Sequence, residues 1–173
     1  MFARTAALTL TLALPANAQD TAGAWAPTFT SRHGDWDVTC DARGDGAARE
    51  ERCYMRYIDI YAPQPNFGVL FMFLEIEDAA PVISLGREFE TDLVATALRV
   101  SPGWTRSEAL CTGGPCEIAG PQALAMVEAL SAGGMLEIGF TDATGADQLR
   151  QWPAEAFGAA FVDVVREAEA RGL

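Results

Sequence analysis

The sequence predicts a mainly β protein, a β-sandwich-like single domain with a short helix near residues 121–132 and a C-terminal helix near 154–169. Residues 35–41 and 136–140 alternate between apolar and polar side chains, as half-buried strands do. Residues 67–76 are almost entirely apolar, as in a central strand, and residues 157–168 carry an apolar stripe at helical spacing. With 50% hydrophobic residues in a chain of 173, a folded core is expected.

Residues 1–18 have the features of a secretory signal peptide. Arg4 supplies the positive charge, Thr5 to Leu14 form the apolar segment, and Ala16-Asn17-Ala18 is a small-x-small cleavage site. The apolar segment has about ten residues, whereas a membrane span needs roughly twenty. We therefore expect no transmembrane anchor, and a chain that is periplasmic or secreted after signal-peptide cleavage.

The composition is strongly acidic, with 24 acidic and 12 basic residues and a net charge of −12. Such a surface repels nucleic acid and anionic lipid, so neither is expected as a partner. Residues 19–33 are predicted to form an N-terminal arm, and residues 34–173 a single domain. His33 is the only histidine, so neither a metal site nor a Ser-His pair is predicted around it.

Four cysteines, Cys40, Cys53, Cys111 and Cys116, are expected to form structural disulfides, because the count is even and the chain is exported. Four cysteines allow three pairings, and the sequence alone does not choose among them. Proximity favours Cys40–Cys53 and Cys111–Cys116, since short loops close most readily. A zinc site or a redox pair are the alternatives, but the C-x12-C and C-x4-C spacings fit zinc ribbons badly and C-x-x-C is absent.

The first half of the domain reads as strands. Residues 35–41 place Trp36, Val38 and Cys40 on one face, and residues 53–61 form a second strand that the first bridge would join to it. A cluster of arginines lies here: Arg43, Arg49, Arg52 and Arg56. Charge balance with Asp41, Asp45, Glu50 and Glu51 explains the cluster, and contact with an anion or a partner is the alternative.

Residues 67–76 are predicted to be a central strand buried on both faces. After a turn over 77–81, residues 82–85 and 94–100 each fit a strand, although 88–98 also fits a short helix. Pro102-Gly103 predicts a turn.

The second half alternates helices and strands. Pro121 suits the first turn of a helix and Gly133 its end, with an apolar face formed by Ala123, Leu124, Val127 and Leu130. Strands are predicted at 136–140 and 148–152, joined by a turn over 142–145. In the last helix, Phe157, Phe161 and Val164 share one face, which we expect to pack on the sheet.

Several motifs together resemble the invasion-associated locus B family, small exported proteins of alphaproteobacteria. The motifs are GDWDVTCD, RCYM, CTGGPCEI, PQALAMVEALSAGG, MLEIGF and a final W-P-x-x-x-F, within residues 34–165. Residues 77–104 match poorly. The resemblance implies a β-sandwich-like fold with short helices, two local disulfides and a place in the cell envelope. It supplies no catalytic residues.

The predicted function is that of a non-catalytic periplasmic or envelope protein, which binds an envelope or host protein or supports the envelope. No catalytic, cofactor-binding or metal-binding residues are predicted. The alternative is a carbohydrate-binding protein or hydrolase using surface carboxylates: Asp35, Asp37, Glu75 or Glu77. It requires two carboxylates about 5–10 Å apart beside an exposed aromatic side chain such as Trp36 or Trp104.

The mature chain should begin at Gln19, because Ala16 and Ala18 suit the signal peptidase. Intact-mass spectrometry of the exported protein checks this. A retained N-terminus, or a mass increased by lipid, would contradict the prediction of a cleaved and unanchored chain.

Overall fold

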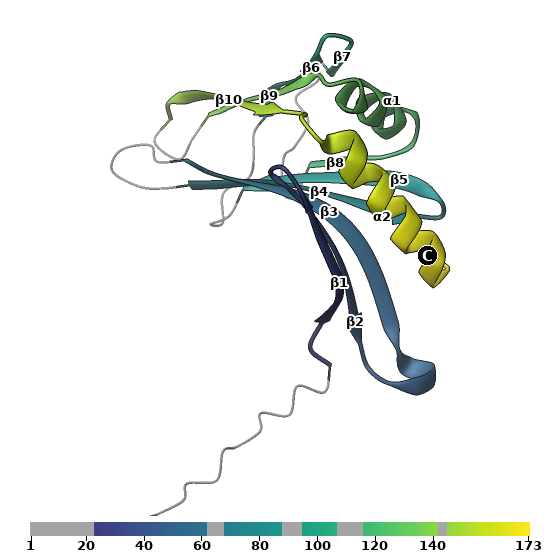
Figure 1. The fold of residues 1–173 in the computed structure, drawn as a ribbon. Helices are drawn as coiled ribbons and strands as arrows, with labels where there is room; N and C mark the ends of the chain where they lie inside the picture. The colour runs from purple at the N-terminus through teal and green to yellow at the C-terminus, as the bar shows by residue number, and fades with distance from the viewer. Residues whose placement is uncertain (1–22, 62–67, 88–94, 107–115, 142–144) are drawn as a thin grey trace, which may run out of the picture.

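The computed structural model describes residues 23–61, 68–87, 95–106, 116–141 and 145–173. The described residues form two antiparallel sheets and two α-helices, which confirms the predicted mainly β, β-sandwich-like fold (Figure 1). The predicted signal peptide, residues 1–18, lies outside the described residues.

Sheet A has six strands in the order β1-β2-β3-β4-β5-β8, and sheet B has four in the order β10-β9-β6-β7. The strands of sheet A are β1 (Ala26–His33), β2 (Trp36–Arg43), β3 (Glu50–Tyr61), β4 (Gly68–Glu77), β5 (Ala80–Arg87) and β8 (Cys116–Ile118). The strands of sheet B are β6 (Ala95–Ser101), β7 (Trp104–Arg106), β9 (Met135–Thr141) and β10 (Asp147–Pro153). The helices are α1 (Gly120–Ser131), α2 (Phe157–Arg171) and the short 3-10 helix η1 (Gly46–Ala48).

Strand β2 has the predicted alternation, with Trp36, Val38 and Cys40 buried in the core. Cys40 lies directly opposite Cys53 on β3, and the two form a disulfide, which confirms the first predicted bridge. Cys116 is buried in β8, whereas Cys111 lies outside the described residues. The pairing of Cys111 with Cys116 therefore remains a prediction.

Part of the segment predicted to be an arm is instead an edge strand. Residues 26–33 form β1, which pairs with β2 along its length. The side chains of this strand are mostly polar, so the sequence lacked the apolar alternation by which strands are recognised. Its backbone hydrogen bonds to β2 hold it in the sheet.

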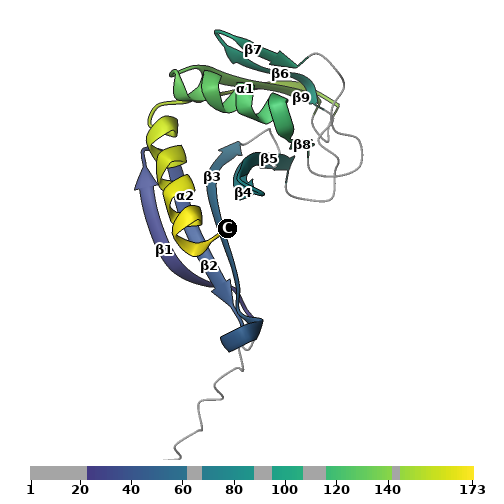
Figure 2. The same cartoon turned by 90° about the vertical axis from the view of Figure 1, so that its right-hand side faces the viewer.

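The prediction that β4 is buried on both faces is wrong. Leu70, Met72 and Leu74 are buried, but Phe71 and Phe73, which alternate with them, are only half-buried. We call the buried side of sheet A its inner face. Both α2 and sheet B pack on the inner face, so the described part of the chain leaves the opposite, outer face without a covering layer (Figures 1 and 2).

Sheet B is joined to the inner face of sheet A by aromatic rings and one ion pair. The ring of Tyr57 on β3 lies between Trp36 on β2 and Trp152 on β10, with centroid distances of 5.0 and 4.7 Å. Arg150 on β10 donates two hydrogen bonds to Asp59, at 2.7 and 2.9 Å, and Trp152 Nε1 donates a third at 2.9 Å. These contacts fix β10 across the end of β3.

The apolar face of α1 differs from the predicted one at one position. Ala123, Val127 and Leu130 are buried as expected, but Met126 is buried where Leu124 was predicted. Leu124 is 54% exposed. The difference is a rotation of the buried face by a fraction of a turn.

Helix α2 begins at Phe157, three residues later than predicted, because Ala156 adopts a left-handed backbone conformation with φ of 61°. Phe157 and Val164 are fully buried, and Phe157 packs edge-on against Trp36 at 4.9 Å. Phe161 packs against the core but is only half-buried. The predicted docking of this helix is therefore confirmed, with Phe157 as its main anchor.

Phe157→Ala should lower the free energy of unfolding by about 3–5 kcal/mol, the range for emptying a buried aromatic site. Phe161→Ala should cost only about 1–2 kcal/mol, because less apolar surface is lost. Urea titration measures both, with Val162→Ala as the control, since Val162 is 65% exposed. Equal losses for the two phenylalanines would contradict the placement of α2.

Candidate binding surface

An apolar patch lies on the outer face of sheet A. Side chains of a strand alternate between faces, so those of β3 and β4 that point away from the core share this face. We call it the isoleucine patch and define it by Ile58, Ile60, Val69, Phe71 and Phe73. Ile58 is 46% exposed and Ile60 is 71% exposed. The other three side chains are half-buried.

The register of the strands makes the isoleucine patch continuous. Ile58 lies opposite Phe71, and Ile60 lies opposite Val69. The rings of Phe71 and Phe73 are 5.3 Å apart. The ring of Phe71 extends over Gly86 on β5, so closely that an added Cβ at this glycine would clash with the ring. The apolar band therefore crosses β3, β4 and β5.

Arg56 borders the patch on the side of β2, and Arg32 lies beyond it on β1, opposite Asp37. Arg56 Nε lies 3.6 Å from Asp37 Oδ2, and Arg32 Nε lies 3.8 Å from Asp37 Oδ1. Arg32 Nε also donates a hydrogen bond to the carbonyl of Gly34 at 3.0 Å. Arg56 Nε is buried and has no hydrogen-bond partner among the described residues. One carboxylate thus faces two guanidinium groups.

At the other end of the outer face, acidic groups are partly shielded from water. Asp41 is 5% exposed and accepts hydrogen bonds from Arg52 and Tyr54, each at 3.2 Å. Burial raises the pKa of the Tyr54 hydroxyl, and the neighbouring Asp41 raises it further. Burial also raises the pKa of Glu75, with Arg52 opposing this effect and Glu77 adding to it.

Trp25 packs over the same end of the outer face. Its ring lies between the guanidinium groups of Arg43, at 4.6 Å, and Arg52, at 4.2 Å. The residues just before β1 are therefore attached to sheet A by cation–π contacts. The sequence did not indicate this contact, because Trp25 lies far from both arginines along the chain.

As predicted, acidic neighbours balance the arginine cluster, but the partner of Arg56 is Asp37, which was not among the acidic residues expected. The pairs are Arg43–Glu50, Arg49–Glu51, Arg52–Asp41 and Arg56–Asp37. Because the arginine of each pair is at least 36% exposed, each pair is expected to add little to stability. Arg56 has the weakest pairing of the four by distance, at 3.6 Å.

The carboxylates considered for a hydrolase do not gather beside an exposed aromatic ring. Asp35 lies in the turn between β1 and β2, and Asp37 is on β2. Asp37 and Glu75 lie on strands separated by β3 and offset by two residues, which corresponds to about 12 Å. Trp36 is 1% exposed and Trp104 is 5% exposed, so both belong to the core instead of a sugar-binding surface.

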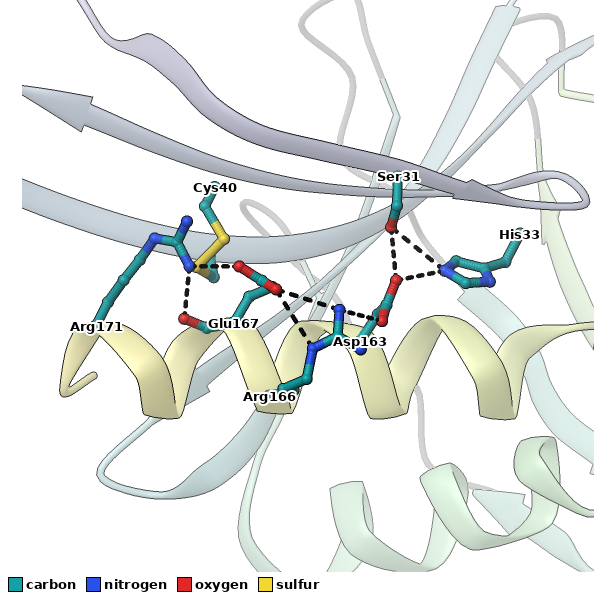
Figure 3. Close-up of polar contacts among 8 residues, drawn as sticks. Ser31, His33, Cys40, Asp163, Arg166, Glu167 and Arg171 are labelled. Atoms are coloured by element: carbon teal, nitrogen blue, oxygen red, sulfur yellow. Dashed lines mark hydrogen bonds and ion pairs between the residues drawn. A yellow bond between two sulfur atoms is a disulfide. The ribbon is translucent and has the colours of Figure 1, made fainter.

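Ser31, His33 and Asp163 do meet, at the contact between β1 and α2 (Figure 3). Asp163 Oδ2 lies 2.7 Å from His33 Nε2 and accepts a hydrogen bond from Ser31 Oγ at 2.8 Å. A carboxylate only accepts, so His33 Nε2 carries the proton. In a catalytic triad the two ring nitrogens bind the serine and the aspartate separately. Here one nitrogen lies beside both, and the contact instead joins α2 to β1.

No group of three or more candidate metal ligands occurs in the part of the chain that the structure describes. Within the same residues, no helix is long and apolar enough to cross a membrane.

These elements define a class of small mainly β proteins, in which a long curved sheet holds a second sheet and a C-terminal helix on one face. Invasion-associated protein B from Bartonella henselae has a similar structure, with a TM-score of 0.52 and 18% identity. The match covers 82% of this chain and 99% of that one. It is a relationship of fold. No family model and no curated protein matches the sequence.

Asp163→Asn should lower the free energy of unfolding at pH 7 by about 1–2 kcal/mol, because hydrogen bonds to a charged acceptor become bonds to a neutral one. His33 and Ser31 lower the pKa of Asp163, burial opposes them, and Arg166 lowers it further. Its contribution is therefore complete above the unfolded pKa of about 3.9 and is lost as pH falls through the lower folded value.

Urea titrations at pH 7 and at about pH 2.5 should show a smaller difference between wild type and Asp163→Asn in acid. Glu169→Gln, an exposed change on the same helix, is the control. An equal loss at both pH values would show that the charge of Asp163 does not stabilise the contact with β1.

Proposed function

We propose that this chain is a non-catalytic protein of the bacterial envelope, periplasmic or secreted, that acts by binding a partner protein through the isoleucine patch. The observation that carries the proposal is the exposure of Ile60, at 71%, and Ile58, at 46%, beside half-buried phenylalanines. Scattered apolar residues are normal on protein surfaces, but a contiguous apolar patch is typical of an interaction site.

The envelope location is supported by the buried Cys40–Cys53 disulfide and by the predicted signal peptide. Disulfides of this kind form in oxidising compartments such as the periplasm. The structural likeness to invasion-associated protein B from Bartonella henselae supports a similar setting. The partner that we expect is an envelope or host protein.

The non-catalytic role is supported by the chemistry of the polar clusters. The Ser31–His33–Asp163 contact uses the protonated ring nitrogen of the histidine as a donor to the carboxylate. Asp59 and Asp163 both have a lowered pKa, because their hydrogen-bond donors favour the charged form. Carboxylates that stay ionised in this way suit structural contacts better than proton transfer near neutral pH.

The double variant Ile58→Ser/Ile60→Ser should lose its partner in the envelope while remaining folded. Both side chains are exposed, so the free energy of unfolding should change by less than about 1 kcal/mol. The chain contains no lysine, so amine-reactive reagents cannot report on this face. A photo-crosslinking amino acid at Ser84, which lies opposite Phe73, is therefore the appropriate probe.

Irradiated cells should give a crosslinked product with the wild-type patch and little with the double variant. Val162→Ser is the matched control, because Val162 is 65% exposed but lies on α2. If the product forms equally with both variants, the isoleucine patch is not the binding surface. If the double variant unfolds at much lower urea, the patch has a structural role instead.

A further inference from the structure

The charges beside the isoleucine patch indicate which kind of partner fits it, given the function proposed above. Arg32 and Arg56 share the single carboxylate of Asp37, with one oxygen 3.8 Å from Arg32 and the other 3.6 Å from Arg56. Two guanidinium groups therefore approach one carboxylate here. The chain as a whole has a net charge of −12, so this border is unlike the average surface.

Arg56 is the arginine placed to contact a bound molecule. It precedes Ile58 by two residues on the same face of β3, so its side chain is adjacent to the patch. Its Nε is buried without a hydrogen-bond partner among the described residues, and its side chain remains 36% exposed. A carboxylate from a partner would pair with the part of this side chain that remains exposed.

The width of the patch fits a helix. It crosses β3, β4 and β5, which is two strand spacings, or about 10 Å, and a helix with its side chains is about 10–12 Å across. An apolar part of a sheet face is normally buried by a second layer, and on the outer face the β3–β4 part is apolar. On the inner face α2 and sheet B provide that layer, whereas no described helix or sheet covers the outer face (Figure 2).

We propose that the isoleucine patch binds an amphipathic acidic helix of a partner protein. Its apolar stripe packs on Ile58, Ile60 and Phe71, and a carboxylate on its flank pairs with Arg56. The proposal predicts that the patch prefers an acidic helix to a basic one. The net charge of the chain predicts the opposite preference, because a negative chain attracts cations. The sign of the preference is therefore a direct test.

The test uses three fluorescent peptides of about 18 residues, long enough for about 27 Å of helix. The first has a leucine stripe flanked by glutamate, the second has the same stripe flanked by lysine, and the third replaces the leucines of the first by serine. Binding to the mature chain is measured by fluorescence anisotropy at about 150 mM salt, where long-range repulsion is screened. The variants are Ile58→Ser/Ile60→Ser and Arg56→Gln. Arg166→Gln on α2 is the control, since that side chain is 60% exposed.

The leucine–glutamate peptide should bind about tenfold more tightly than the leucine–lysine peptide, and the serine peptide should not bind. The isoleucine variant should abolish binding, and Arg56→Gln should weaken the glutamate peptide about fivefold without affecting the lysine peptide, as loss of one exposed charge pair implies. Arg166→Gln should leave all three unchanged.

Binding that needs the isoleucines but shows no preference for glutamate would overturn the acidic helix and leave the proposed function standing. Equal effects of Arg56→Gln and Arg166→Gln would overturn the role of Arg56. Concentration-dependent dimers in sedimentation, lost in the isoleucine variant, would assign the patch to a second copy. Isoleucine-dependent binding to neutral phosphatidylcholine vesicles would assign it to lipid. If no peptide binds and the isoleucine variant gives as much envelope crosslink as the wild type, both proposals are overturned.

Discussion

The contact of Asp59 with Arg150 and Trp152 determines how the two sheets meet. Burial on its own would raise the pKa of Asp59, but the hydrogen bonds of Arg150 and Trp152 and the arginine charge outweigh it, so the pKa lies below its ordinary value. The carboxylate therefore remains charged and holds both donors. Because Trp152 is one of them, its ring is fixed against Tyr57 and, through Tyr57, against Trp36. Trp36 in turn supports Phe157 of α2.

This contact has a consequence for the opposite side of sheet A. It places sheet B over the end of β3, while α2 occupies the same face beside it (Figure 1). Both covering layers are thus on the inner face. Strand β4 nevertheless has large apolar side chains on both faces, and those of the outer face have no such layer among the described residues. The exposed isoleucines follow from this uneven cover, because sheet A is apolar on its inner face and also on the β3–β4 part of its outer face.

Much of the fold could be predicted from the sequence where periodicity was strong. The alternation in β2 predicted its buried residues, and the apolar stripe of α2 predicted the face that packs on the sheet. Two local features misled the prediction. The polar side chains of β1 concealed a strand that backbone hydrogen bonds hold in place, and the continuous apolar run of β4 suggested cover on both faces. Neither the pairing of β1 nor the burial of β4 can be predicted from the segment's own sequence, because both depend on which distant elements pack on it.

The candidate site was harder to predict for the same reason. Ile58 and Ile60 belonged to a strand with apolar residues on both faces, so the sequence did not show which face was covered. One signal was present. Asp59 lies between them and points inward to Arg150, so the polar residue faces the core and its apolar neighbours face outward. A reversed alternation of this kind can be recognised only once the partner of the aspartate is known.

The acidity of the chain is compatible with an exposed apolar patch. Patches of this kind bring the risk of self-association, and like charges oppose it. With a net charge of −12, two copies repel each other beyond the short range of their patches. The positive charge of Arg56 lies at the border of the patch, so it acts at contact distance where salt screens little. The net charge can therefore oppose self-association of the chain, while Arg56 still favours a partner that carries a carboxylate.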